Sequence, residues 1–119
     1  STAEQRQIWM MRLSSDNNAK PAAVFMGDHH AREHVSMEIP VRLVRYLLEE
    51  YEKKNPRVVS ILNTYEVFII PRLNADGADF DVATGSYRSW RKNRTKNSDG
   101  NFGVDLNRNY GYGWGGAGA

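Results

Sequence analysis

The three histidines of this chain all lie within one eight-residue stretch, residues 27–34 (GDHHAREH). His30 and Glu33 are three residues apart, where an apolar run meets a predicted helix, so both side chains can turn toward one point. An imidazole nitrogen and a carboxylate oxygen both suit Zn²⁺, and a catalytic zinc usually has three protein ligands plus a water. The pair therefore predicts part of a zinc site. The alternative is a surface helix start, with Asp28 as its cap and Glu33 favoured by the helix dipole.

A second polar segment, residues 87–94 (YRSWRKNR), surrounds Trp90 with the four cations Arg88, Arg91, Lys92 and Arg94. Three interpretations stay open for it. It could be a solvated loop, or a nucleic-acid contact in which cations and an aromatic ring act together. It could also recognise an anion, with arginines gripping a carboxylate or stabilising an oxyanion.

A third polar segment is residues 103–110 (GVDLNRNY). Asn107 and Arg108 are adjacent, and together they could donate an amide and a guanidinium to a carboxylate. Asp105 could accept the free ring N–H of a metal-binding histidine, the usual partner of such a ligand. An ordinary hydrogen-bonded loop would explain either piece alone.

The elements that must position these segments follow from the apolar pattern. Helical spacing after the histidine stretch and β-branched runs on either side of it predict an alternating α/β order. The expected elements are a mostly buried strand over 6–13, a buried strand over 22–26, helices over about 34–54 and 56–62, and a strand over 65–72. Pro40 should bend the first helix or lie in its first turns. No regular element is predicted after residue 72.

Because ligand sites in α/β sheets lie beyond the carboxyl ends of strands, residues 27–34 stand where a site is expected.

The composition limits the class of protein. With 119 residues, one domain is expected. The absence of cysteine excludes a disulfide scaffold and a thiolate metal site. A net charge of +2 does not require a nucleic-acid partner, and no apolar run approaches the length of a membrane span. We therefore expect neither nucleic acid nor membrane as a partner.

The segments HHAREH, GSYRSWRKNR and DLNRNYGYGW, in this order, resemble the zinc metallocarboxypeptidases related to pancreatic carboxypeptidase A. The residues of these segments are most similar to those of the bacterial carboxypeptidase T branch. The resemblance runs from about Arg6 to Trp114. The resemblance implies an α/β fold, part of a three-layer α/β/α domain with a mixed, mostly buried sheet. It implies Zn²⁺ as the cofactor and removal of C-terminal residues from peptides by zinc-activated water as the activity.

The resemblance also implies roles at the reacting centre. His30 and Glu33 correspond to the first two zinc ligands, and Asp105 to the acid that orients the histidine. Arg91 corresponds to the catalytic cation that polarises the scissile carbonyl and holds the oxyanion. The other two histidines have no ligand role in the family pattern, and we expect them to be structural.

Four further residues are implied to contact substrate. Asn107 and Arg108 correspond to the pair that binds the C-terminal carboxylate, and Arg32 and Arg88 to arginines that contact the substrate away from the cleaved bond. The expected partners are therefore peptide or protein C-termini, and the expected location is secreted or periplasmic. The alternative function is a non-catalytic module of the same fold that binds peptide C-termini.

The family's third zinc ligand and general base follow the Asn-Arg pair at a distance that this chain does not reach. Residues 1–119 are accordingly predicted to be the N-terminal portion of a catalytic domain, inactive alone, with a flexible glycine-rich end over 111–119. Such a portion would expose surface meant for the remainder of its domain, and we expect that surface to favour self-association.

Overall fold

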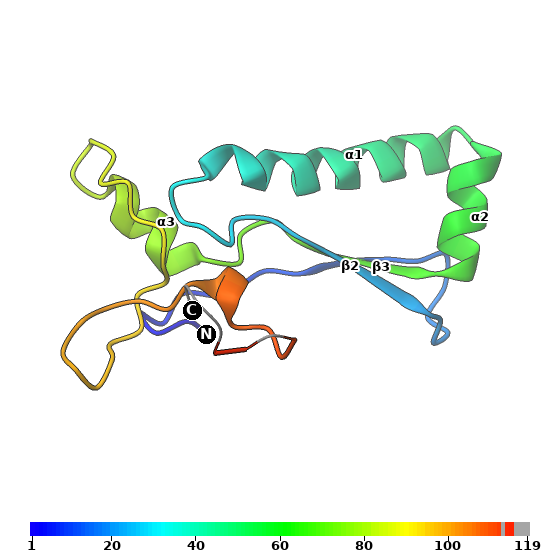
Figure 1. The fold of residues 1–119 in the computed structure, drawn as a ribbon. Helices are drawn as coiled ribbons and strands as arrows, with labels where there is room; N and C mark the ends of the chain where they lie inside the picture. The colour runs from blue at the N-terminus through cyan, green and yellow to red at the C-terminus, as the bar shows by residue number, and fades with distance from the viewer. Residues whose placement is uncertain (113, 116–119) are drawn as a thin grey trace.

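The computed structural model describes residues 1–112, 114 and 115. Part of the glycine-rich end that was predicted to be flexible, at 113 and 116–119, therefore lies outside the described residues. Strands, α-helices and two short 3₁₀ turns alternate along the chain (Figure 1). In order they are β1 (Met11–Leu13), β2 (Ala22–Met26), η1 (His34–Met37), α1 (Glu38–Glu52), α2 (Pro56–Thr64), β3 (Glu66–Ile70), α3 (Ala75–Val82) and η2 (Leu106–Arg108).

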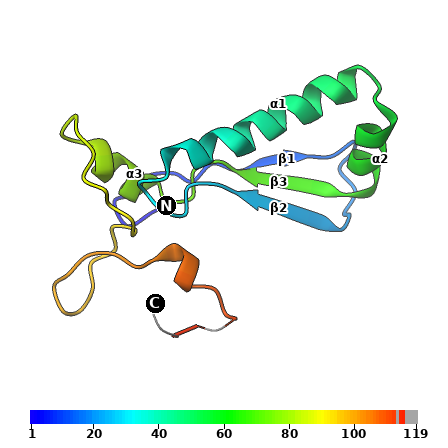
Figure 2. The ribbon, with the colours of Figure 1, turned by 45° about the horizontal axis from the view of Figure 1, so that its top comes forward.

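The three strands of the described residues form one mixed sheet in the order β1-β3-β2. β1 pairs antiparallel with β3, and β2 pairs parallel with it. The helix α1 lies along one face of this sheet and α2 lies at its end (Figure 2). Between the sheet and these helices is the apolar core, made of Leu13, Leu47, Val58, Leu62, Val67 and Ile69. The α/β class and the mixed sheet are confirmed.

The other face of the sheet is open among the described residues. β2 forms where the sequence predicts it, but most of its residues are exposed. Val24 is 53% exposed and Phe25 is 46% exposed. The described residues thus supply the sheet and one helical layer, because α1 covers one face and α2 lies at the end of the sheet. The expectation of a buried β2 strand is wrong for these residues.

The two long helices begin as their sequences indicate. Pro40 is the third residue of α1, in the first turn, where backbone amides have no partner within the helix. Pro56 opens α2 directly after Asn55, whose side-chain oxygen accepts the Arg57 amide at 3.1 Å. Pro40 therefore leaves α1 continuous to Glu52.

Two further predictions, the strand over 6–13 and the lack of any regular element after residue 72, were wrong. The strand predicted over 6–13 is paired only from Met11, and Trp9 before it is 78% exposed. Its first residues turn instead toward α3, where Arg6 forms ion pairs with Asp76 and Asp79. α3 itself was not predicted, because its sequence, ADGADFDV, has no apolar stripe.

No helix among the described residues has the length and apolar character needed to span a membrane.

Candidate metal and substrate site

Gly27 directs the chain from β2 into the histidine stretch. Its amide donates to Ile70 O at 2.9 Å, and its carbonyl accepts the Leu73 amide at 3.1 Å. A Cβ atom here would lie 2.5 Å from Ser36 O and 2.7 Å from Pro71 O. Only glycine fits between these carbonyls. Residues 28–33 consequently emerge beyond the carboxyl ends of the parallel strands β2 and β3, the usual place for a ligand site.

Asp28 follows in a left-handed conformation, with φ at 58°. Its amide donates to Ser36 Oγ at 3.0 Å. Its side chain is fully buried, and neither carboxylate oxygen has a hydrogen-bond partner among the described residues. Burial raises the pKa of Asp28 to about 7, although Arg72 Nε lies 3.8 Å from Oδ2 and opposes that rise. The alternative interpretation, in which Asp28 caps a helix start, is therefore not supported, because its side chain accepts no hydrogen bond among the described residues.

His30 lies between two carboxylates. Its Nδ1 is 2.9 Å from Glu33 Oε1, and its Nε2 is 3.2 Å from Asp105 Oδ1. A neutral imidazole carries one N–H, so it can donate to only one of these acceptors. The other nitrogen then faces a carboxylate oxygen with its lone pair. A cation between Nδ1 and Glu33 would satisfy both atoms.

The separation of the two candidate ligands suits zinc. Two ligand atoms on a tetrahedral zinc, each about 2.1 Å from the metal, are about 3.4 Å apart. The Nδ1–Oε1 distance of 2.9 Å would need to widen by only about half an ångström. The side chain of Glu33 is half exposed and free to make that shift. Among residues 1–112, 114 and 115, no group of three or more histidine or acidic side chains converges on one metal position.

Asp105 connects His30, one of the two candidate zinc ligands, to Arg91. Its Oδ1 lies 3.2 Å from His30 Nε2 and accepts the Asn107 amide at 2.9 Å. Its Oδ2 accepts Arg91 Nε–H at 2.9 Å. Burial raises the pKa of Asp105, but the hydrogen bonds from Arg91 and Asn107 outweigh burial and hold that pKa below its usual range. Because Asp105 lies at the start of the η2 turn, that turn is tied to the metal pair.

Arg91 is held at two points. Besides the bond to Asp105, its carbonyl accepts the Ala31 amide at 3.1 Å, inside the histidine stretch. Its terminal Nη1 lies 4.0 Å from Glu33 Oε1. The guanidinium therefore stands beside the candidate metal position. Its Nε is engaged with Asp105, and its terminal Nη1 is near Glu33 Oε1.

The substrate residues predicted from sequence fall into two groups. Asn107 lines an open hollow of about 390 Å³ together with His30 and Glu33. Arg32, Arg88 and Arg108 are exposed and do not line that hollow. Arg88 donates to Phe80 O at 2.8 Å, and Arg108 donates to Asn107 O at 3.1 Å. The structure thus brings five of the eight residues together: His30, Glu33, Arg91, Asp105 and Asn107.

Sequence reasoning missed one residue that organises the site. Asn74 is buried, and its side-chain amide donates to His29 O at 3.1 Å and to Lys92 O at 3.2 Å. Its Oδ1 accepts the Gly77 amide at 3.2 Å and caps α3. A single side chain therefore joins the histidine stretch, the arginine segment and α3. Asparagine is a favoured helix N-cap residue, and that preference was the available signal for this cap.

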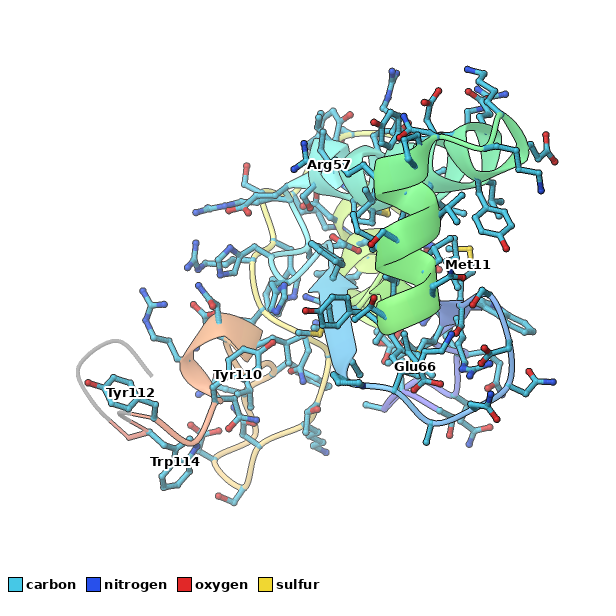
Figure 3. The ribbon with its side chains drawn as sticks, turned by 90° about the vertical axis from the view of Figure 1, so that its right-hand side faces the viewer. Met11, Arg57, Glu66, Tyr110, Tyr112 and Trp114 are labelled. Carbon is cyan, nitrogen blue, oxygen red and sulfur yellow. The ribbon has the colours of Figure 1, made fainter. Side chains whose placement is uncertain are left out.

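The C-terminal part of the described chain extends away from the body formed by α1, α2 and the sheet. Figure 3 shows Tyr110, Tyr112 and Trp114 on this extension. Tyr110 turns back toward the site, where its hydroxyl lies 2.5 Å from His29 Nε2. Tyr112 and Trp114 are exposed.

Comparisons with known proteins agree with this geometry. The family model described as zinc carboxypeptidase matches residues 1–119. A zinc carboxypeptidase from Saccharothrix mutabilis subsp. capreolus is 44% identical over 114 residues, which cover 92% of this chain and 26% of that protein. A metallocarboxypeptidase A from Trichophyton tonsurans is 40% identical over 107 residues, covering 89% of this chain and 25% of that protein.

Solved structures give the same result. Carboxypeptidase A from Helicoverpa armigera superposes with a TM-score of 0.78 at 29% identity, over 99% of this chain and 29% of that one. Bovine thrombin-activatable fibrinolysis inhibitor, solved with tick carboxypeptidase inhibitor, superposes with a TM-score of 0.78 at 30% identity, over 100% of this chain and 37% of that one.

The chain spans about a quarter of the length of the curated relatives it matches. The closer likeness to the carboxypeptidase T branch stays a prediction. Because the family model matches over the full length, and the relatives and solved structures agree with it, the chain belongs to the zinc carboxypeptidase family, a family of zinc-dependent peptide hydrolases.

Proposed function

We propose that this chain supplies part of the active site of a zinc-dependent carboxypeptidase that removes C-terminal residues from peptides. The observation that carries the proposal is the cluster around Asp105, which joins His30 to Arg91 through one buried carboxylate. A metal-binding histidine and a guanidinium held side by side suit a reaction in which negative charge develops on a carbonyl oxygen.

In this proposal His30 and Glu33 hold the zinc ion, which polarises the scissile carbonyl and acidifies a water when bound. Asp105 keeps the proton on Nε2 of His30, so that Nδ1 presents its lone pair to the metal. Asp105 also engages Nε of Arg91. The terminal N–H groups of Arg91 are then left to donate to the developing oxyanion.

Asn107 and Arg108 bind the carboxylate at the end of the substrate. Asn107 lines the same hollow as His30 and Glu33, so a chain end bound there lies near the reacting centre. Arg32 and Arg88, both exposed, contact the substrate farther from the cleaved bond. The partners are accordingly peptides or proteins with a free C-terminus.

Two further properties belong to the proposal. The active protein is secreted or periplasmic, as expected from the carboxypeptidase resemblance. The isolated 119-residue chain is inactive and self-associates. Inactivity is supported by the two candidate zinc ligands of the described chain, since a catalytic zinc usually has three protein ligands. Self-association is supported by the exposed residues of β2. Sedimentation at high concentration tests the second part, and a strictly monomeric mass would contradict it.

The test uses the protein that contains this chain and two peptides of the same sequence, both blocked at the N-terminus. One peptide has a free C-terminal carboxylate, and the other has an amidated C-terminus. We expect release of the terminal residue from the free peptide alone, lost with a zinc chelator and restored by zinc. Equal hydrolysis of both peptides would contradict recognition of the carboxylate. Saturable binding of the free peptide without hydrolysis would favour the non-catalytic binding module.

A further inference from the structure

Asp81, a buried carboxylate outside the Asp105 cluster, links the segment that carries the candidate zinc ligands to the segment that carries Arg91. Asp81 lies in α3 and its side chain is fully buried. Its Oδ2 accepts the Nε2–H of His34 at 2.8 Å. Its Oδ1 accepts the backbone amide of Trp90 at 2.6 Å. Both oxygens of this carboxylate are thus satisfied by segments that are distant in sequence.

The partners of Asp81 are direct neighbours of the residues proposed to do the chemistry. His34 immediately follows Glu33, a candidate zinc ligand, and Trp90 immediately precedes Arg91, the candidate oxyanion cation. The carboxylate of Asp81 therefore connects the metal-binding turn, residues 30–34, to the arginine segment, residues 87–94. No atom of this connection needs to touch substrate or metal.

Other contacts strengthen the same connection. The carbonyl of Asp81 accepts the Arg88 amide at 3.0 Å. The ring of Tyr87 lies against the ring of His34, with centroids 5.5 Å apart. At its other end, the arginine segment is held by the bond from the Ala31 amide to Arg91 O.

We propose that His34 and Asp81 are positioning residues that hold the Arg91 segment in register with the metal-binding turn. The inference rests on the proposed function, because Arg91 is the group through which the pair acts. Removing the imidazole leaves Oδ2 of Asp81 buried without a partner, which is costly enough to displace the segment. Arg91 keeps its bond to Asp105, so its donor is misplaced and not deleted.

The expected loss of kcat is smaller than the loss from deleting the Arg91 donor, because the donor is only misplaced. Deleting an oxyanion donor outright lowers kcat by about 100- to 1000-fold, so we expect misplacing Arg91 to lower kcat by about tenfold. KM should change little, since neither His34 nor Asp81 touches the substrate in the proposal. His34→Gln should restore most of the activity, because its amide N–H can donate to Asp81. Tyr87→Phe is the matched control, because it keeps the aromatic contact and should leave kcat unchanged.

The experiment measures these variants in the protein that contains this chain, alone and combined with Arg91→Ala. If His34 acts through Arg91, the change to alanine lowers kcat with Arg91 present and has no further effect once Arg91 is gone. Equal losses in both backgrounds would show a general structural role and overturn the inference. Loss of bound zinc from His34→Ala would also overturn it, since the pair would then act on the metal.

Amide hydrogen exchange separates this inference from the proposed function. In His34→Ala the amides of residues 88–91 should exchange faster, and in His34→Gln they should keep their protection. Unchanged exchange in the alanine variant would overturn the positioning role, whatever the activity. A wild-type protein with no chelator-sensitive release of C-terminal residues would instead contradict the proposed function, and the exchange result would still decide whether His34 and Asp81 hold the segment.

Discussion

Replacing Asp105 with asparagine tests the central contact of the site. The carboxylate accepts from His30 and the Asn107 amide on one oxygen and from Arg91 on the other. An asparagine has one oxygen, so it can keep the two donors on the Oδ1 side only by turning its amide nitrogen toward Arg91. Arg91 then faces a donor instead of an acceptor. His30 keeps an acceptor that has lost its charge.

The expected loss follows from these contacts. Changes to the hydrogen-bond partner of a metal-binding histidine usually cost about 10- to 100-fold in metal affinity or activity. Asp105→Asn keeps the bond to His30 and should lie near the lower limit, about 1.4 kcal/mol of zinc-binding free energy. Asp105→Ala removes the bond and should lie near the upper limit, about 2.7 kcal/mol. Competition with a chromogenic chelator measures both values in the protein that contains this chain.

Asp99 supplies the control. It is exposed, and among the described residues its carboxylate accepts hydrogen bonds from nearby Asn101. Asp99→Asn should leave zinc affinity and kcat unchanged. If Asp105→Ala bound zinc as tightly as the Asp99 variant does, His30 would not depend on Asp105, and our account of the metal pair would be refuted.

Three further changes are predicted. Gly27→Ala should destabilise the protein by about 1–3 kcal/mol, because its Cβ would overlap two backbone carbonyl oxygens, whereas Gly111→Ala meets no atom within 4 Å and should leave the melting temperature unchanged. Asp28→Asn should raise the melting temperature by several degrees at pH 8 and not at pH 4. The folded state raises the pKa of Asp28 from 3.8 to about 7, so wild-type stability falls as pH rises through that window; a constant difference between the two pH values would refute this. Tyr110 follows η2, the turn that carries Asn107 and Arg108, by two residues. Tyr110→Phe removes the contact with His29 and should raise KM for free-carboxylate peptides about threefold with kcat unchanged, a typical loss for one hydrogen bond; unchanged kinetics would show that this contact does not position η2.

Much of the fold could be predicted from local patterns. The spacing of apolar residues predicted α1 and α2, and β-branched content predicted β3, because each of these elements buries one regular face. The α3 helix could not be predicted in this way. Its stability depends on the cap from Asn74 and on ion pairs between its aspartates and Arg6 and Arg72, which are contacts outside the helix.

The candidate site shows the same division. Residue types and spacing predicted His30 and Glu33 as a possible zinc pair, and the resemblance to the zinc metallocarboxypeptidases implied the role of Arg91. The sequence could not show that Nδ1 of His30 faces Glu33 while Nε2 faces Asp105, 75 residues away. It also could not show that His34, with no role in the family pattern, binds Asp81.

The sequence by itself therefore determined which groups are available and which of them share a local turn, because backbone periodicity and residue chemistry are local properties. The tertiary structure alone decided which groups meet. Asp105 and Asp81 each lie far along the chain from the histidines that they bind. Their contacts arise only when the parallel strands β2 and β3, together with α3, bring the connecting segments to one end of the sheet.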